Sequence, residues 1–235
     1  MKNAVWFLAV TLALGGCASQ PGGADKATEA SICRKDFASL EEKSKADLDA
    51  CMAARTELQA AVDKDTEASA QQADAMKAME GDLRDRLKTE IAAKDVEIER
   101  LRSKLSVHVL DRVLFTKGSA DILPGGLRVL DKVAAAVREG KETIRVEGHT
   151  DDLPIGADLK KKYFSNWELS SARASAVVRY FEYHSRISPT RMEVVGFSQY
   201  RPFVPNDSDA NRKRNRRVEI ILTAWNPESG NAPSP

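Results

Sequence analysis

The sequence contains few of the groups that catalysis or metal binding would need. Its 235 residues include three cysteines and three histidines, and none of these is spaced as a paired C-x-x-C or a similar metal-ligand motif. The serines have no histidine placed as a partner, and the carboxylates of Asp151 and Asp152 are adjacent rather than opposed. The sequence therefore predicts a protein that is not an enzyme and that has no metal site and no cofactor.

A large net charge is also missing. There are 36 basic and 35 acidic residues, interleaved along the chain, which leaves a formal net charge of +1. This balance excludes a general electrostatic attraction to nucleic acid, so we expect no nucleic-acid partner. The basic run 212–217 is a local exception. It is either a solvated loop before a strand or a binding element, and both interpretations stay open.

The first residues resemble a bacterial lipoprotein signal. Lys2 precedes an apolar run, residues 4–14, which has the length of a signal-peptide core. The run is shorter than the roughly 20 apolar residues that a membrane-spanning helix needs. Small residues then lead to Cys17, as in the lipobox, where the signal is cleaved and the cysteine is lipid-modified. We expect residues 1–16 to be a signal peptide and Cys17 to be the lipidation site, which would attach the mature chain to a membrane.

The residues after Cys17 indicate which membrane would be reached. Ala18 and Ser19 include no aspartate, which in the lipoprotein pattern implies sorting to the outer membrane, with the chain facing the periplasm. Residues 17–27 are rich in Gly, Ala, Pro and Ser. We predict that they form a flexible tether.

A long stretch without helix breakers follows. Residues 28–105 contain no proline and one glycine, Gly81, and we predict a helical spacer over this range. At about 1.5 Å per residue it would be on the order of 100 Å long. Its apolar residues recur in heptads of two phases, Val62, Met76 and Leu83 in the first and Leu87, Ile91, Ile98, Leu101 and Leu105 in the second. Two interpretations stay open, a parallel self-associating coiled coil and a solvated single or hairpin helix.

Two cysteines lie within this spacer. Cys33 and Cys51 are 18 residues apart, which on one straight helix corresponds to roughly 27 Å, far beyond the reach of a disulfide. In an oxidising periplasm they would pair either across two chains of a parallel dimer or within a chain whose helix folds back. The sequence does not choose between these arrangements.

The pattern changes from residue 106 to one of alternating strands and helices. We predict strands over 107–115, 143–148, 192–196 and 217–223, and helices over 124–140 and 166–184. The expected fold class is α+β, a βαβαββ mixed sheet with helices on one face. This domain would cover residues 106–224, and we expect the Pro- and Gly-rich residues 225–235 to be disordered.

Several motifs in this region carry a family resemblance. They are Phe115-x-x-Gly118-Ser119-Ala120, Val146-x-Gly148-His149-Thr150-Asp151, Asn166-x-x-Leu169-Ser170-x-x-Arg173-Ala174, Gly196-Phe197-Ser198 and Asn215-Arg216-Arg217-Val218-Glu219. Together they resemble the OmpA-like C-terminal domain, a peptidoglycan-binding module, and are most similar to the form found in flagellar motor protein B. The resemblance covers about residues 107–223.

The resemblance also implies a binding site. In this family an aspartate and an arginine hold diaminopimelate of the peptidoglycan stem peptide, and the matching positions are Asp151 and Arg173. Asp151 would accept from the ligand ammonium, and the planar fork of Arg173 would hold its carboxylate. Thr150 and Asn166 are the candidate supporting hydrogen-bonding residues. His149 is interpreted as a structural turn residue, and Arg216 and Arg217 as braces of the loop and strand.

These features predict a non-catalytic outer-membrane lipoprotein that tethers the envelope to the cell wall. Its expected partners are peptidoglycan, a membrane through the N-terminal lipid, and a second copy through the helical region. The alternative is a wall-anchored component of a larger motor- or secretion-associated machine, in which the helical region docks partners. The lipobox stands where the motor protein has a membrane-spanning helix, so a stator role is not expected.

Overall fold

The computed structural model describes residues 25–101 and 104–224, with side chains from residue 28 onward. The predicted signal peptide, Cys17, most of the tether and the C-terminal tail lie outside these residues. The chain divides after Asp63 into two compact units. Among the described helices, none is long and apolar enough to cross a membrane.

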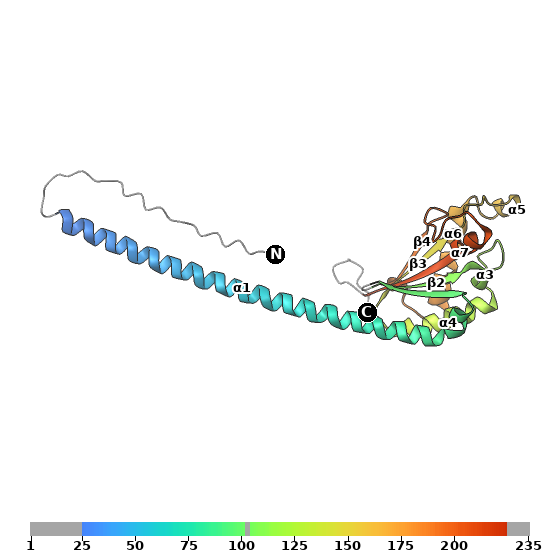
Figure 1. Cartoon of the computed structure of the whole chain (residues 1–235), viewed down its shortest axis with the longest axis horizontal. Helices are drawn as coiled ribbons and strands as arrows, with labels where there is room; N and C mark the ends of the chain where they lie inside the picture. The colour runs from blue at the N-terminus through green and yellow to red at the C-terminus, as the bar shows by residue number, and fades with distance from the viewer. Residues whose placement is uncertain (1–24, 102–103, 225–235) are drawn as a thin grey trace. The chain divides into compact units, whose positions relative to one another are not determined.

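Helix α1 (Asp25–Arg86) is the longest element and accounts for most of the predicted spacer (Figure 1). It is continuous because Gly81 is its one glycine and it contains no proline. In the first unit every side chain from residue 28 to residue 63 is exposed. The last turns, in the second unit, bury Met76 and Leu83. The predicted long N-terminal helix is therefore confirmed, but it ends earlier than expected.

The predicted helix over 87–105 is wrong beyond Ala92. After α1 the chain forms a short helix, α2 (Lys88–Ala92), and Lys94 then adopts a left-handed conformation with φ of 58°. An antiparallel pair of strands follows, β1 (Val96–Leu101) and β2 (Lys104–Leu110). Ile98 and Leu105, which were assigned to one heptad position, lie on two different strands.

The physical reason for this correction is the local period of the apolar residues. Val96 and Ile98 alternate with exposed glutamates, and Val107 and Val109 alternate with the polar residues Ser106 and His108, which are buried on the other face. Both patterns have the two-residue period of a strand. Val96 pairs with Val109 and Ile98 with Val107, so the alternating apolar residues of both strands face the core. Leu101, the other expected heptad residue, remains largely exposed.

The sheet has five strands in the order β1-β2-β5-β3-β4. The remaining strands are β3 (Thr143–His149), β4 (Met192–Gly196) and β5 (Arg217–Thr223). β3 and β4 are parallel and the other pairs are antiparallel, so the predicted mixed α+β sheet is confirmed. The expected first strand, 107–115, instead ends at Leu110 and is followed by the short helix α3 (Asp111–Leu114).

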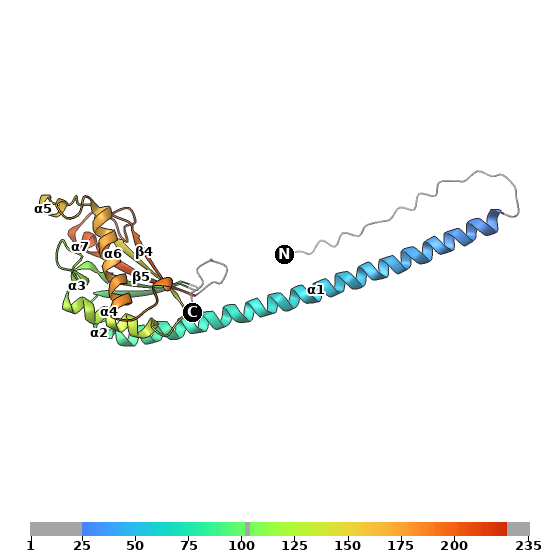
Figure 2. The same ribbon diagram turned by 180° about the vertical axis from the view of Figure 1, so that it is seen from behind.

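Two longer helices of the domain were predicted closely. Helix α4 (Pro124–Val137) begins at a proline, and α6 (Asn166–Tyr183) begins after a serine cap. The short elements α5 (Ala157–Lys160), η1 (Pro189–Arg191) and α7 (Asp209–Asn215) occupy segments that were expected to be loops. Figure 2 shows α4 and α6 in front of the strands, on one side of the sheet.

The core lies between these helices and the sheet. Its fully buried members come from β2, β3 and β5 and from the inner faces of α4 and α6, and they include Leu105, Val107, Val109, Ile144, Val146, Val218, Ile220, Leu222, Val133, Val177 and Phe181. Met76, Leu83 and Leu87 belong to the same cluster. Each such side chain contributes about 1.5–3 kcal/mol relative to an exposed one. The end of α1 is therefore part of the domain core.

Candidate functional site

Two glycines bring α6 directly onto the sheet. Gly148 of β3 and Gly196 of β4 are register partners. A Cβ atom at Gly148 would lie 2.0 Å from the backbone oxygen of Ser170, and one at Gly196 would lie 2.1 Å from Ser171 Oγ. Only residues without a side chain permit this approach. The contact places the second turn of α6 over the end of β3, and it thereby places Arg173 close to the loop that bears Asp151.

Asp151 is fixed at the exit of β3. Its Oδ1 accepts from the backbone N–H of Leu153 at 3.2 Å, and its Oδ2 accepts from Arg216 Nη1 in a short ion pair. The preceding residue, Thr150, donates its backbone N–H to Ser198 O at 2.9 Å. Only 6% of Asp151 is exposed. The carboxylate is thus held in place before any ligand arrives.

Arg173 lies in the second turn of α6, whose start is defined by its cap. Ser165 and Glu168 form a capping box, in which Glu168 accepts from the Ser165 backbone at 2.7 Å. The Arg173 guanidinium donates from Nε to Ser119 O at 3.1 Å and lies over the ring of Phe115 at 5.4 Å. Burial lowers the pKa of Arg173, and the nearby carboxylates of Asp111 and Asp151 oppose that shift. Both acids thus favour the charged form of the guanidinium.

Asp111 completes the charge arrangement, although no motif of the sequence pointed to it. Its Oδ1 lies 3.0 Å from Arg173 Nη2, and its Oδ2 lies 3.9 Å from Arg216 Nε. Burial raises the pKa of Asp111, although both arginines oppose that shift. Asp111 was hidden in the sequence because residues 107–115 were expected to form one strand, whereas the chain leaves the sheet at Leu110.

Four charged side chains therefore alternate in sign across the site. Asp151 pairs with Arg216, Arg216 lies near Asp111, and Asp111 pairs with Arg173. Two carboxylates and two guanidinium groups give the array no net charge. Arg216 was expected to brace the loop, and it does pair with Asp151. It also lines the cavity next to these four charges.

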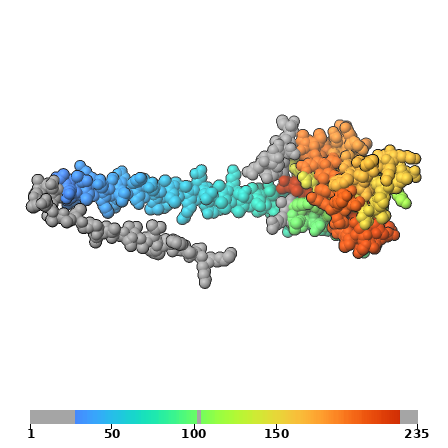
Figure 3. All heavy atoms as spheres, turned by 90° about the horizontal axis from the view of Figure 1, so that it is seen from above, coloured from blue at the N-terminus to red at the C-terminus, as the bar shows by residue number. Residues whose placement is uncertain are grey.

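The array opens into a cavity of about 760 Å³. Its polar lining includes all four predicted binding residues, Thr150, Asp151, Asn166 and Arg173, and also Asp111 and Arg216. Its apolar lining comprises Phe115, Leu123, Leu153, Pro154, Ile155, Leu159 and Leu169. Figure 3 shows the segment around residues 150–165 beside the segment around residues 205–215, and both contribute to this lining. The cavity thus combines opposite charges with an apolar wall.

The side chains of Asn166 and Thr150 already donate hydrogen bonds within the protein. They stabilise the loop that bears Asp151 rather than offer free donors to a ligand. Asn166 Nδ2 donates to Leu153 O at 3.0 Å and to Gln199 Oε1 at 3.2 Å. The Thr150 hydroxyl donates to Asp151 O at 3.0 Å. Gln199 was not anticipated, because it comes from the loop after β4 and no motif marked it. These contacts hold the Asp151 loop against the start of α6.

The opposite face of the sheet is a buried polar layer. Glu147 of β3 and Glu219 of β5 are direct register partners, and His149 lies one position further along the same face. Their ligand atoms lie within 4.8 Å of one another. No metal-ligand spacing in the sequence marks these residues, because they come from two strands that are distant in the sequence. His149 is 2% exposed and stacks on Phe197, which agrees with a structural role.

Arg217 pairs with one of the two acids of this layer. Its Nε donates to Glu219 Oε1 at 2.7 Å, and His108 Nδ1 lies 3.3 Å from the same oxygen. Burial alone would raise the pKa of the Glu219 carboxyl, but His108, Arg217 and His149 lower it to about 2. Glu219 is therefore ionised at neutral pH. Arg217 braces the strand, as predicted.

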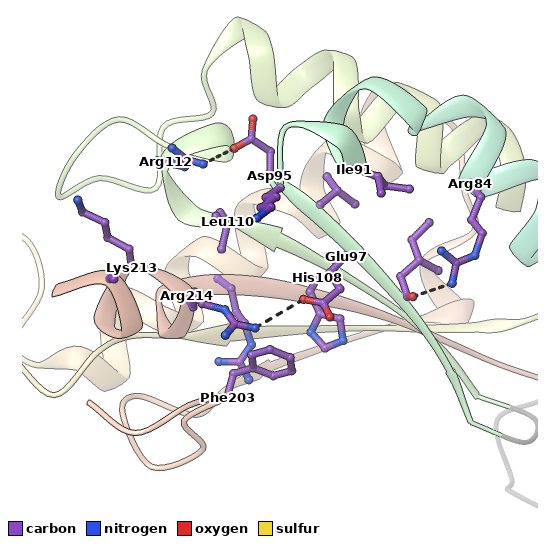
Figure 4. Close-up of a pocket in the computed structure, with 15 residues that line it drawn as sticks. Arg84, Ile91, Asp95, Glu97, His108, Leu110, Arg112, Phe203, Lys213 and Arg214 are labelled. Carbon is purple, nitrogen blue, oxygen red and sulfur yellow. Dashed lines mark hydrogen bonds and ion pairs between the residues drawn. The ribbon is translucent and has the colours of Figure 1, made fainter. Parts of the chain in front are cut away.

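A second cavity, of about 850 Å³, lies between β1, β2, α2 and α7 (Figure 4). Its arginines are engaged with neighbouring groups, Arg84 with Ile98 O at 3.0 Å and Arg112 with Asp95 at 2.7 Å. Arg214 lies 3.9 Å from Glu97. None of the predicted binding residues lines this cavity. The smaller cavity, with its alternating charges, is therefore the better candidate site.

Known proteins share this domain. A model described as the OmpA family matches residues 114–216. The uncharacterized protein YtxE of Bacillus subtilis is 38% identical over 112 residues, which cover 48% of this chain and 45% of the relative. The chain spans about half the length of the curated relatives it matches.

Two solved structures are similar over nearly their whole length. A MotB-like protein from Desulfovibrio vulgaris is 29% identical with a TM-score of 0.61, covering 67% of this chain and 99% of that one. The cell wall anchor of the T6SS from Pseudomonas aeruginosa is 33% identical with a TM-score of 0.56, covering 61% of this chain and 97% of that one. Sequence motifs, fold and these relatives agree, and the chain therefore contains an OmpA-like domain whose homologues include MotB-type domains.

Proposed function

We propose that the domain binds peptidoglycan by holding the zwitterionic end of diaminopimelate in the Asp151–Arg173 cavity. The observation that carries the proposal is the alternating array in one cavity of two arginines and two acids, the buried Asp151 and the half-buried Asp111. The free end of diaminopimelate bears an ammonium and a carboxylate on one carbon. A ligand with both charges suits a neutral array, because a ligand with one charge would leave an opposite charge unmatched in a buried place.

Each half of the ligand has a distinct partner. Asp151 has already accepted two hydrogen bonds, and a carboxylate has about four acceptor positions, so it can take a further bond from the ammonium. Arg173 and Arg216 both line the cavity and supply planar donor forks for the carboxylate. The apolar wall suits the methylene chain of the same residue. No step of this binding involves chemistry on the ligand, and we propose a non-catalytic role.

We further propose that the chain tethers the envelope to the wall as an outer-membrane lipoprotein. In this proposal a lipid on Cys17 holds one end in the outer membrane and the domain in the periplasm holds peptidoglycan. The lipobox-like segment before Cys17 supports the anchor, and the relative described as a cell wall anchor supports the wall contact.

A second candidate is a wall-anchored component of a larger machine. The relatives include motility protein B and the cell wall anchor of a secretion system, which supports this alternative. The exposed side chains of α1 in the first unit would then dock partners. Chemical cross-linking of the full chain in its native envelope separates the two proposals. Recovery of a heterologous envelope protein at α1 supports the machine component, whereas a simple tether links only to wall and to itself.

Co-sedimentation with purified wall sacculi tests the binding site. We expect Asp151→Ala to weaken binding at least about thirtyfold, because it removes one partner from a buried charge pair. Asp152→Ala is the matched control, since Asp152 is the same residue type, adjacent and exposed. Arg173→Lys keeps the charge but loses the fork, and we expect it to bind weakly while remaining folded by circular dichroism.

The ligand is tested with a second wall type. Walls whose stem peptide carries lysine offer the ammonium without the carboxylate, so we expect the wild type to bind them far less than diaminopimelate walls. Equal sedimentation with both walls, or wild-type binding by both site variants, would rule out the proposed clamp. Analysis of released muropeptides after incubation checks the non-catalytic assignment, and we expect no new fragments.

A further inference from the structure

The first-unit part of α1 is a helix whose side chains are all exposed. From residue 28 to residue 63 no side chain is classed as buried or half-buried. Large apolar groups are among them, including Phe37 at 69% and Leu40 at 68% exposure. Most helices in proteins owe their stability to packing of an apolar face rather than to propensity alone. This segment therefore has a surface suited to a partner.

Most of the large exposed apolar residues share one side of the helix with both cysteines, whereas Ile32 and Met52 lie about 100° away on either flank. Cys33 and Cys51 are separated by 18 residues, which is about five turns at 3.6 residues per turn, so their thiols point in the same direction. At about 100° per residue, Phe37, Leu40, Leu48 and Leu58 lie within about 60° of that direction. We call these six residues the cysteine stripe. Ser44 and Arg55 lie on the same side.

The continuity of α1 removes one of the two ways in which the cysteines could pair. No break interrupts the helix between Cys33 and Cys51, and both side chains are exposed with free thiols. Their separation along the axis, roughly 27 Å, is far beyond the Cα distances of a disulfide. A disulfide between Cys33 and Cys51 of one chain is thus excluded by geometry. A second thiol must come from outside this helix.

Charges beside the stripe indicate the orientation of a second helix. Glu29, Asp36 and Asp47 lie along one border, where Lys43 is an exception. Arg34 and Lys45 lie along the other border, where Glu41 and Asp63 are exceptions. In a parallel pair the twofold axis runs along the helices and brings the acidic border of one onto the basic border of the other. An antiparallel pair would place the acidic borders together. Parallel pairing therefore gives the better charge complementarity.

We propose that α1 pairs in parallel and in register with a second copy of this chain through the cysteine stripe. Cys33 then faces Cys33, and Cys51 faces Cys51, and each pair forms an interchain disulfide. In each bond two thiols lose two protons and two electrons to a disulfide oxidant, which is reduced to two thiols. Formation of the disulfides depends on the proposed function, which places the chain in an oxidising compartment. Pairing of the helices does not depend on it.

Dimerisation would change how the domain holds the wall. Two OmpA-like domains joined through α1 can engage two stem peptides of one polymer. The second binding event becomes intramolecular, and the apparent affinity then exceeds that of one domain without any new contact. The helix would thus be a coupling element as well as a spacer.

The full chain, purified in detergent and treated with oxidised glutathione, tests the pairing. We expect a dimer on non-reducing gels for the wild type and for Cys33→Ser or Cys51→Ser alone, and none for the double variant. Trypsin cuts after Lys26, Arg34, Lys45 and Arg55, so each cysteine has its own peptide, 27–34 or 46–55. We expect linked pairs of 27–34 with 27–34 and of 46–55 with 46–55. Linkage of 27–34 to 46–55, or no dimer, would overturn the proposal.

A second set of variants separates the stripe from the cysteines. In a chain with both cysteines replaced by serine, Leu40→Glu with Leu58→Glu should weaken dimerisation at least about tenfold in sedimentation equilibrium, because burial of the stripe is lost. Ala46→Glu with Ala53→Glu is the matched control on the opposite side of the helix and should leave it unchanged. Equal effects of the two pairs would refute the stripe. All of these variants keep Asp151, so their co-sedimentation with sacculi measures the wall site separately from dimerisation. The two proposals can therefore fail independently.

Discussion

The exposed part of α1 and the OmpA-like domain are both rich in charge, yet they use it differently. Along residues 28–63 every charged side chain is exposed, whereas in the domain Asp151, Arg173 and Arg217 are nearly inaccessible. Exposed pairs are screened by water and contribute little, while a buried charge that loses its partner is costly. Charged residues therefore keep the surface of α1 solvated, whereas in the domain they fix the positions of the side chains with which they pair.

The largest expected effect is the removal of a buried charge from the domain. Arg217→Met leaves Glu219 and Glu147 opposed on neighbouring strands, and we expect the free energy of unfolding to fall by about 3–5 kcal/mol. Arg34→Met in α1 should change it by less than about 0.5 kcal/mol. Urea denaturation followed by far-ultraviolet circular dichroism measures both. Similar losses in the two variants would contradict the distinction between the regions.

One helix contains both environments, which makes the comparison sharper. Leu83 is fully buried at the end of α1, whereas Leu58 is 67% exposed. We expect Leu83→Ala to lower the free energy of domain unfolding by about 2–4 kcal/mol, and Leu58→Ala to leave it within about 0.5 kcal/mol. Trp167 fluorescence during denaturation provides the readout. If Leu83→Ala were neutral, the end of α1 would not belong to the domain core.

The buried carboxylate of the polar layer should make domain stability depend on pH. The pKa of Glu219 is lowered from 4.5 to about 2, so its stabilising contribution is complete above about pH 4.5 and is lost as the pH falls toward 2. We expect this loss to be on the order of 2 kcal/mol. The contribution of Glu219 is isolated by comparing denaturation curves of the wild type and Glu219→Gln between about pH 4.5 and about pH 2. Parallel pH profiles for the two proteins would show that Glu219 is not the group responsible.

The smallest expected effect concerns the cap of α6. Ser165→Ala removes the side-chain acceptor of the capping box, and we expect a loss of about 1 kcal/mol in the free energy of unfolding. Ser165→Asp should retain most of it, because aspartate is also a good cap. Thermal denaturation of the three proteins decides this. A loss shared by the aspartate variant would mean that the cap does not explain the effect.

The sequence was most informative where one local period matched one element. Residues 192–196 and 217–223 alternate or form short apolar runs, and both were predicted with the bounds that the structure has. The motifs also identified four residues that the fold brings to one cavity. The sequence misled where two periods were compatible, as for Ile98 and Leu105, which are seven residues apart but lie on paired strands.

The sequence by itself determined the long helix, the OmpA-like topology and the motifs that line the candidate site, because propensity, apolar period and motif order act locally along the chain. The tertiary structure alone decided that α1 stops at Arg86, that Asp111 and Arg216 join the site, and that Glu147 faces Glu219. These features depend on strand register and on the contact of α6 with Gly148 and Gly196. Such contacts join residues that are far apart in the sequence, so no local pattern records them.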